Sequence, residues 1–188
     1  MFVSNVTKEF ELGPDSMLME IGSNDGYLLQ FVRQRGIPCL GIEPARDPAQ
    51  EARKKGLQTL IKFFGRQCAE NVLKNYGAAD LVCGANVLAH VPDLNDFVSG
   101  LSMVIKPLGI VTMEFPHLLR LLEQTQFDTI YNEHYSYLSA STTLRLFAAH
   151  ELKVFRIEEW PTHGGSLRVF ACRASAGDLF PVEPSVSK

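Results

Sequence analysis

The 188 residues carry a formal net charge of −3, with 46% hydrophobic and 21% charged side chains, the balance of an ordinary globular domain. Lys and Arg are scattered rather than striped, so nucleic acid is not an expected partner. No apolar stretch approaches the roughly 18 residues of a membrane-spanning helix, and the N-terminus lacks the apolar core of a signal peptide. These features predict a cytoplasmic domain with no membrane contact, as a monomer or dimer.

The four cysteines, Cys39, Cys68, Cys83 and Cys172, lie far apart and form no CxxC pair. Zinc sites and disulfide frameworks need closer, patterned spacing. We therefore expect no metal site and no disulfide.

Strand-like and helix-like runs alternate along the chain. In chain order we predict strand 16–21, helix 26–35, strand 38–42, helix 48–55, strand 57–61, helix 66–75, strand 80–85, helix 94–105, strand 110–114, helix 142–149 and strands 154–158 and 167–172. Gly164-Gly165 predicts a turn that joins the last two strands into a hairpin. The pattern predicts an α/β fold with a doubly wound, mostly parallel seven-stranded sheet.

This pattern also divides the chain. We expect an N-terminal extension over residues 1–15 and a single domain over residues 16–173. The Pro/Ser-rich residues 174–188 are expected to form a flexible tail.

The first predicted strand runs into Glu20-Ile21-Gly22-Ser23-Asn24-Asp25-Gly26, which has the form E-x-G-x-x-x-G. A dinucleotide fingerprint, G-x-G-x-x-G, needs its second glycine so that the backbone can approach a pyrophosphate. Here Asn24 occupies that position, and Tyr27 occupies the position of the third glycine. The pattern suits a ligand with a ribose and a base but no phosphates, such as S-adenosylmethionine (SAM).

In a doubly wound sheet a ligand lies over the carboxyl ends of the strands, where three segments of this chain would meet. The cofactor-binding residues predicted from them are Glu20, Gly22, Ser23, Asn24, Gly26, Tyr27, Glu43, Pro44, Ala85, Asn86 and Val87. Gly22 would permit a close approach to the methionine part of the ligand, and Glu43 would accept hydrogen bonds from the ribose hydroxyls. The alternatives are an ordinary turn, an exposed acid before Pro44 and a packing site for small residues.

Two further positions border this region. Phe63-Phe64 follows the third predicted strand and would pack against the adenine ring or, alternatively, belong to the core. His90, within Val87-Leu88-Ala89-His90-Val91-Pro92-Asp93, resembles a segment common in small-molecule methyltransferases. We expect His90 to border the cofactor without acting as a base.

Tyr, Glu and His concentrate beyond the fifth predicted strand, in residues 114–117 and 129–137, and again in residues 162–169. Loops in this position carry substrate groups in such folds. With residues 20–29 and 86–98, these segments resemble the sugar C-methyltransferases, class I SAM-dependent enzymes that methylate nucleotide-linked 4-keto-deoxysugars at carbon 3. The resemblance covers about residues 16–173. Its most specific motif is Tyr-x-Glu-His-Tyr-Ser-Tyr at 131–137.

The resemblance implies a fold in which the C-terminal hairpin inserts one antiparallel strand, and it implies roles for the motif. Carbon becomes nucleophilic only after a proton α to a carbonyl is removed, which needs a base poised near neutral pH. His134 is the implied base, Glu133 would orient a neighbour or bind the sugar, and Tyr131 would position the substrate or polarise its carbonyl. The other implied substrate-binding residues are His117, Tyr137 and His163. His163 would alternatively cap the hairpin.

The geometry of the motif stays open at this point. If the segment is helical, Tyr131 and His134 share a face. If it is extended, Tyr131 and Glu133 share a face and His134 points away.

The chain departs from the family in two ways. We expect these residues to represent the core domain only, without the cysteine-rich zinc-binding domain with which members usually begin and the further α/β domain with which many end. Asn132 also stands where the family more often has His. The alternatives are an O- or N-methyltransferase of another small metabolite, a non-catalytic SAM-binding fragment, or a hydride-transferring Rossmann enzyme, against which the missing second glycine argues.

Overall fold

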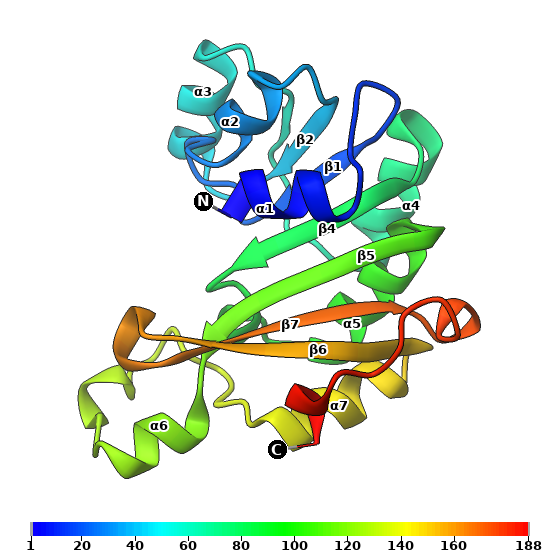
Figure 1. Ribbon diagram of the computed structural model, residues 1–188. Coiled ribbons are helices and arrows are strands. Elements are labelled where there is room, and N and C mark those ends of the chain that lie inside the picture. Colours follow the sequence, from blue (N-terminus) through cyan, green and yellow to red (C-terminus); the bar gives the residue numbers. More distant parts are fainter. Residues whose placement is uncertain (1, 188) are drawn as a thin grey trace.

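The computed structural model describes residues 2–187 and contains one seven-stranded sheet with helices on both faces (Figure 1). The strands are β1 (Leu18–Ile21), β2 (Cys39–Ile42), β3 (Thr59–Leu60), β4 (Ala79–Ala85), β5 (Ile105–Pro116), β6 (Leu152–Trp160) and β7 (Ser166–Arg173). The α-helices are α1 (Phe2–Glu9), α2 (Leu29–Arg33), α3 (Arg46–Lys54), α4 (Arg66–Tyr76), α5 (Leu94–Val104), α6 (Leu118–Glu123) and α7 (Ala140–Ala148). Short 3₁₀ turns include η1 (Leu88–His90) and η2 (Phe127–Thr129).

The strand order is β3-β2-β1-β4-β5-β7-β6. Strands β1 to β5 pair in parallel, whereas β7 pairs antiparallel with both β5 and β6. The predicted doubly wound, mostly parallel sheet with a C-terminal hairpin is therefore confirmed. The strand order reverses between the parallel strands β1 and β4, which places their carboxyl ends at the switch point where such sheets bind ligands.

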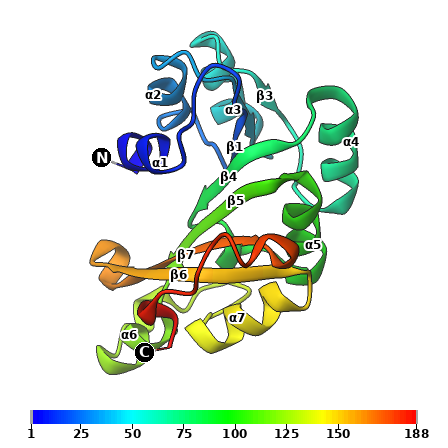
Figure 2. The ribbon, with the colours of Figure 1, turned by 45° about the vertical axis from the view of Figure 1, so that its right-hand side comes forward.

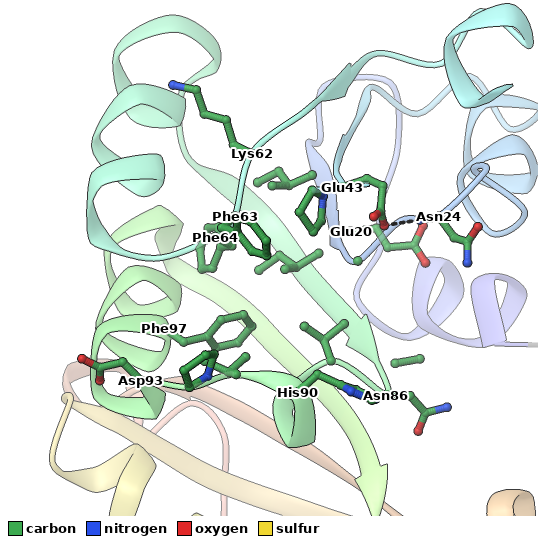
Figure 3. A pocket seen from close by; sticks show the side chains of 18 of the residues that line it. Glu20, Asn24, Glu43, Lys62, Phe63, Phe64, Asn86, His90, Asp93 and Phe97 are labelled. Carbon is green, nitrogen blue, oxygen red and sulfur yellow. Dashed lines mark hydrogen bonds between the residues drawn. The ribbon is translucent and has the colours of Figure 1, made fainter. Parts of the chain in front are cut away.

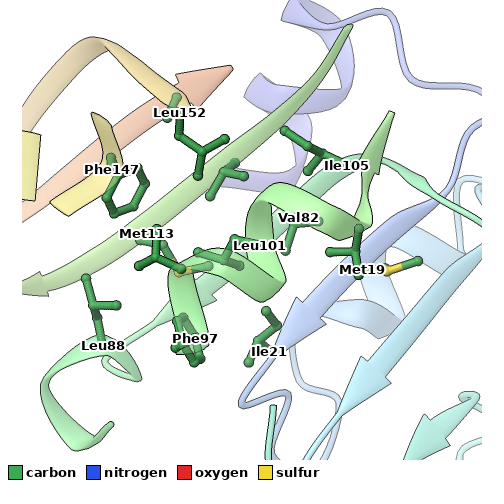
Figure 4. Close-up of a cluster of buried hydrophobic side chains, with 14 of the residues drawn as sticks. Met19, Ile21, Val82, Leu88, Phe97, Leu101, Ile105, Met113, Phe147 and Leu152 are labelled. Carbon is green, nitrogen blue, oxygen red and sulfur yellow. The ribbon is translucent and has the colours of Figure 1, made fainter. Parts of the chain in front are cut away.

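Each face of the sheet has its own apolar cluster, because alternate residues of a strand point to opposite faces. In the first cluster, Leu18 and Leu81 pack with α1, α2 and α3. In the second cluster, on the other face, Met19 and Val82 pack with α4, α5 and α7. Figure 2 shows α1 and α2 on the opposite side of the sheet from α4 and α5. Figure 4 shows the second cluster, in which Phe97 of α5 lies close to the carboxyl end of β1.

Several boundaries differ from the sequence-based expectation. Helix α2 is limited to Leu29–Arg33 because the turn after β1 extends through residue 28. Helix α5 ends at Val104, so Lys106-Pro107 follows the helix end as expected, but it lies within β5, which starts at Ile105. Helices α1 and α6 were not predicted from the sequence pattern. Residues 130–137 are neither helical nor a strand, so neither geometry considered for the motif is correct.

Both ends of the described chain pack on the domain. Val3 and Val6 of α1 are buried in the first cluster, so residues 2–9 cover one face of the sheet. Near the C-terminus, Glu183 N donates to Phe155 O at 2.8 Å, which lays the tail along β6. The predicted flexibility of this tail stays a prediction. Across residues 2–187, no helix combines the length and apolarity that crossing a bilayer requires.

Candidate active site

A cavity of about 870 Å³ opens over the carboxyl ends of β1, β2 and β4 (Figure 3). Its volume lies within the range of about 300–1,000 Å³ that is typical of small-molecule sites. The predicted cofactor residues that line it are Glu20, Gly22, Asn24, Tyr27, Glu43, Pro44, Phe63, Phe64, Ala85, Asn86, Val87 and His90. The structure thus gathers residues from four separate segments around one space, which we call the main cavity.

The turn after β1 brings its backbone close to the segment after β4. Gly22 has a φ of +68°, and a Cβ atom at this position would lie 2.4 Å from Cγ2 of Val87. Only glycine combines this left-handed conformation with such a close approach at no steric cost. Gly22 therefore lets the turn after β1 lie close to Val87 at the base of the main cavity.

Glu43 holds the same turn from β2. Its Oε2 accepts a hydrogen bond from Asn24 N at 2.9 Å, and its Oε1 accepts one from Ala45 N at 2.8 Å. The side chain is buried but lines the cavity, and each carboxylate oxygen has a second lone pair. Glu43 is therefore pre-oriented and can still accept hydrogen bonds from a vicinal diol.

Glu20 is the most perturbed acid of the site. Only 2% of the residue is exposed, and Oε2 has no hydrogen-bond partner within the described chain. Burial, with the nearby charges of Glu43 and Asp25, raises the pKa of Glu20 to about 8. A buried carboxyl group without a partner is costly, so this group is poised to receive a cationic or hydrogen-bond-donating ligand.

The charge of the main cavity is mostly negative. Glu43 lies on one side and Asp93 and Asp96 on the other, while Glu20 adds a carboxyl group whose raised pKa keeps it protonated near neutral pH. Lys62 is the only Lys or Arg among the described lining residues. Such a wall disfavours phosphates and suits a ligand that carries positive charge, as the sulfonium and ammonium groups of SAM do. The electrostatics agree with the interpretation of the glycine pattern.

Two phenylalanine side chains form a wall of the main cavity across from Glu43. Phe63 is 85% exposed, whereas Phe64 packs edge-on against Phe97 with ring centroids 5.3 Å apart. Figure 3 shows both phenylalanines on the cavity wall opposite Glu43. The exposed ring of Phe63 offers a stacking surface for a planar base, while Phe64 serves the core as well as the cavity.

Of the predicted catalytic motif at 131–137, Tyr135 alone is among the described residues that line the main cavity, and Tyr131, Glu133 and His134 line neither this cavity nor the one beside it. His134 approaches the cavity through its contact with His90, which lines it, with ring centroids 4.7 Å apart. His90 Nδ1 also lies 2.9 Å from the carbonyl oxygen of Glu133. This hydrogen bond ties the motif to the segment after β4.

The imidazole of His134 is fixed on both sides. Nδ1 lies 2.7 Å from the carbonyl oxygen of Thr129, which can only accept, so Nδ1 carries the proton. Nε2 therefore bears the lone pair and accepts from the hydroxyl of Tyr131 at 3.1 Å. The carboxylate of Glu133 makes no hydrogen bond or ion pair with residues 2–187. No contact in the described structure therefore supports the prediction that Glu133 orients a neighbouring side chain.

Some predicted residues lie away from the main cavity. Ser23 is fully buried beneath the turn against Gly41, and Gly26 makes room for Leu57. His117 is buried at the start of α6, where burial lowers its pKa, and it lines neither the main cavity nor the one beside it. Tyr137 contacts the ring of His134 edge-on.

His163 is the predicted residue that the structure puts in a different cavity. It lines a neighbouring space of about 300 Å³ and lies 2.8 Å from the amide nitrogen of Asn86. Asp93, Asp96 and Phe97 also line the main cavity and were not predicted from the sequence. Asp93 caps α5 by accepting from Asp96 N, and this capping pattern was the signal available in the sequence.

Comparison with known proteins agrees with this geometry. Residues 3–157 match the family model of a methyltransferase domain, and the chain belongs to that family. It is a methyltransferase domain of the class I fold, whose cofactor is SAM.

The names of two curated relatives imply different methyl-accepting atoms, carbon in one and oxygen in the other. The chain is 37% identical over 172 residues to C-methyltransferase NovU of Streptomyces niveus, covering 92% of this chain and 40% of that protein. It is 27% identical over 99 residues to a ubiquinone biosynthesis O-methyltransferase of Colwellia psychrerythraea, covering 52% of this chain and 40% of that protein. The matched part thus spans about two fifths of these relatives.

Solved structures share the fold at low sequence identity. Magnesium protoporphyrin IX methyltransferase of Synechocystis, solved with bound S-adenosylhomocysteine, has a TM-score of 0.68 at 15% identity, covering 91% of this chain and 79% of that one. A SAM-dependent methyltransferase of Mesorhizobium loti has a TM-score of 0.67 at 14% identity, covering 90% of this chain and 96% of that one.

Proposed function

We propose that this chain transfers the methyl group of SAM to a carbon atom α to the ketone of a nucleotide-linked keto-deoxysugar. The sequence support is the 37% identity to a protein named as a C-methyltransferase. The observation that carries the proposal is the state of His134, whose Nε2 is unprotonated and accepts a hydrogen bond from the hydroxyl of Tyr131. An imidazole in this tautomer is suited to removing a weakly acidic proton near neutral pH.

The proposed reaction has two parts. His134 takes the proton from the carbon next to the carbonyl, and the electron pair moves into the carbonyl to give an enolate. A hydrogen-bond donor must then stabilise the enolate oxygen, which is the proposed role of Tyr131. The nucleophilic carbon displaces the methyl group from the sulfonium in line, so alignment of the two ligands is the main further requirement.

In this proposal SAM occupies the main cavity. Glu43 accepts from the ribose hydroxyls, Phe63 stacks on the adenine, and the unpartnered Glu20 faces the cationic methionine end. Ser23 and Gly26 act indirectly, by shaping the turn. His117 and Tyr137 support the substrate segment, His117 from the start of α6 and Tyr137 from the ring of His134.

The test uses a thymidine-diphosphate-linked 4-keto-6-deoxyhexose as acceptor. Methyl transfer from SAM is followed by mass spectrometry, and exchange of the α-proton in D₂O is followed by NMR with S-adenosylhomocysteine in place of SAM. His134→Asn should slow both processes by about 10²–10⁴-fold, the usual contribution of a general base. His150→Asn is the matched control, because His150 pairs with Asn95 and lines neither cavity.

Three results would contradict the proposal in different ways. Unchanged proton exchange in His134→Asn would mean that another group is the base. Methylation of a hydroxyl or amine on other small metabolites, with no product from any ketone, would favour the O- or N-methyltransferase alternative. Tight binding of S-adenosylhomocysteine without turnover would identify a non-catalytic SAM-binding fragment.

A further inference from the structure

Residues 117–138 form a long loop between β5 and α7 whose two ends are held together. His117 and Leu138 pair as an isolated bridge, and Leu118 N donates to Leu138 O at 3.1 Å. Between these ends lie α6, η2 and the motif that contains His134. The position of the His134 imidazole therefore depends on how the middle of this loop is fixed to the rest of the domain.

The middle of the loop has little apolar packing. Phe127 and Ile130 are exposed, whereas Gln126 and Thr129 are half-buried. Segments with few buried apolar contacts are the ones that open most easily. Polar contacts must therefore keep residues 124–130 in place.

Three hydrogen bonds in series connect the turn of the β6–β7 hairpin to His134. Gln126 Nε2 donates to Gly164 O at 2.7 Å. Thr129 Oγ1 donates to Gln126 O at 2.8 Å, and His134 Nδ1 donates to Thr129 O at 2.7 Å. Resting on the proposed function, in which His134 is the base, we propose that Gln126 is a positioning residue for His134. It holds η2 against the hairpin turn, and η2 sets the tautomer and the orientation of the imidazole.

The first argument is the close approach of the loop to the hairpin turn. A Cβ atom on Gly164, whose φ is +74°, would lie 2.5 Å from Nε2 of Gln126 and 2.7 Å from its Cδ. A Cβ atom on Gly165 would lie 2.8 Å from Cβ of Arg120. The glycine pair therefore does more than reverse the chain, because it also lets α6 and Gln126 lie directly against the turn.

The second argument is that both hydrogens of the Gln126 amide are used. Besides Gly164 O, Nε2 donates to Gln124 Oε1 at 2.6 Å. The backbone is fixed as well, since Gln126 N donates to Leu121 O at 3.0 Å. An amide with two acceptors and a bonded backbone is held in one orientation. Gln126 is therefore a fixed point in an otherwise exposed segment.

The third argument is backbone strain beside Gln126. Thr125, which directly precedes it, has a φ of 52°, a conformation that is unfavourable for a β-branched residue. Such strain persists only where surrounding contacts hold it, and it clusters at functional sites. The contacts of Gln126 with Gly164 and Gln124 are among those that hold this turn after α6.

The bond from His134 Nδ1 to Thr129 O matters because a neutral imidazole carries one proton. With that proton on Nδ1, Nε2 is free of hydrogen and accepts from the hydroxyl of Tyr131 at 3.1 Å. If η2 moves, this bond is lost and the proton can occupy either nitrogen. Molecules with the proton on Nε2 cannot use that atom as the base.

The first experiment reads the tautomer of His134 directly. Protein labelled with ¹⁵N-histidine is saturated with S-adenosylhomocysteine, and the imidazole nitrogen shifts are recorded by NMR, with the His134 signals assigned by their loss in His134→Asn. Gln126→Met removes the amide but keeps the length of the side chain, and it should move these signals from the Nδ1–H form toward a mixture of both tautomers. Gln58→Met, just before β3 at the opposite edge of the sheet, is the matched control and should leave them unchanged.

The second experiment separates positioning from folding. In Gln126→Met, kcat for methyl transfer to the thymidine-diphosphate-linked 4-keto-6-deoxyhexose and the rate of α-proton exchange should both fall by about tenfold to a hundredfold. KM for SAM should stay within about twofold, and thermal unfolding should change little, because this part of the loop buries few apolar side chains. Gln126→Lys keeps an N–H donor that can reach Gly164 O and should recover part of the loss.

Thr129→Val tests the next link of the series. It removes Oγ1 at nearly constant shape, so the bond to Gln126 O is lost. The tautomer and kcat should change in the same direction as in Gln126→Met. Because both bonds belong to one series, the double variant should lose little more than the more damaged single variant.

Two outcomes would overturn the inference: an unchanged His134 tautomer in both Gln126→Met and Thr129→Val, or losses of the same size in Gln58→Met. The tautomer measurement needs no turnover, so it decides the inference even if the chain methylates no ketone. Failure of the proposed function looks different. If the tautomer shifts in Gln126→Met while α-proton exchange keeps its wild-type rate, Gln126 still positions the imidazole but His134 is not the base.

Discussion

The carboxylate of Glu43 anchors the backbone of Asn24, a residue 19 positions earlier in the chain, through a hydrogen bond of 2.9 Å. This bond links the end of β2 to the glycine-rich turn after β1. The acid expected to bind the ribose therefore also shapes the turn that contacts the rest of the cofactor. Loss of Glu43 should affect stability and binding together.

We predict that Glu43→Ala weakens S-adenosylhomocysteine binding by more than about tenfold, because hydrogen bonds to charged groups contribute about 1.5–3 kcal/mol each. The free energy of unfolding should also fall by about 1–3 kcal/mol, since Asn24 N and Ala45 N lose their acceptor. Calorimetry and urea unfolding measure the two effects. Glu51→Ala, on the exposed face of α3, is the control, and equal effects in both variants would rule out a specific role for Glu43.

Glu20 should make the stability of the cofactor-free protein depend on pH. Its pKa is raised from 4.5 to about 8 on folding, so between these values the folded state keeps a proton that the unfolded state has lost. Stability is therefore fully present below about pH 4.5 and falls through this window by up to about 1.4 kcal/mol per pH unit. Thermal unfolding between pH 5 and 9 should show a steeper decline for the wild type than for Glu20→Gln. Parallel curves would contradict this assignment.

The same group should couple cofactor binding to proton release. The ammonium group of S-adenosylhomocysteine favours the ionised form of Glu20, so affinity should increase as pH rises from 6 toward 8. Titrations in buffers of different ionisation enthalpy count the protons released. Glu20→Gln should abolish this release, and persistence of the release in that variant would assign it to another group.

Gly22 and Val87 form a steric pair that a double-mutant cycle can test. Gly22→Ala should destabilise the protein by about 1–3 kcal/mol, because the new Cβ would lie 2.4 Å from Val87 Cγ2 in a backbone conformation with positive φ. Adding Val87→Ala should recover part of the loss, the remainder being the conformational cost. Chemical unfolding of the four proteins gives the coupling energy. Strict additivity would mean that the clash is relieved elsewhere.

The ion pair between Glu114 and Arg168 should be costly to break from one side. Both side chains are largely buried, with 11% and 15% exposure. Arg168→Met would leave the Glu114 carboxylate without its cation and should cost about 3–5 kcal/mol. The double variant with Glu114→Gln should be more stable than Arg168→Met alone, since the uncompensated charge is gone. Urea unfolding of both variants checks the order.

Much of the fold could be predicted from the sequence because the signals were local. Near-continuous apolar runs predict buried parallel strands, and the glycines after helices mark their ends. Helix α1 was missed because a short amphipathic segment carries little signal until it packs, here through Val3 and Val6. The early start of β5 was missed because Pro107 and Gly109 predict a break. The pairing with β4 is irregular there: Ile105 pairs with Ala79, and the regular register resumes only with Ile110 and Leu81.

The candidate site shows a similar division. The glycine spacing, Glu43 and the segment after β4 predict the residues around the main cavity, because ligands in such folds meet the carboxyl ends of the strands. The sequence could not assign the imidazole tautomers or distinguish the two cavities. These properties depend on contacts between distant segments, such as His90 with His134 and Asn86 with His163.

By itself the sequence determined the alternation of strands and helices, the absence of a dinucleotide fingerprint and the identity of the cofactor-facing turn. These follow from propensity, periodicity and the conformational freedom of glycine, which act over a few residues. The tertiary structure alone decided that Glu20 Oε2 is buried without a partner among residues 2–187, that Arg168 is neutralised, and that Ser23 lies beneath the turn. Burial and charge pairing are set by residues far away in the chain, and these determine what the cavities can bind.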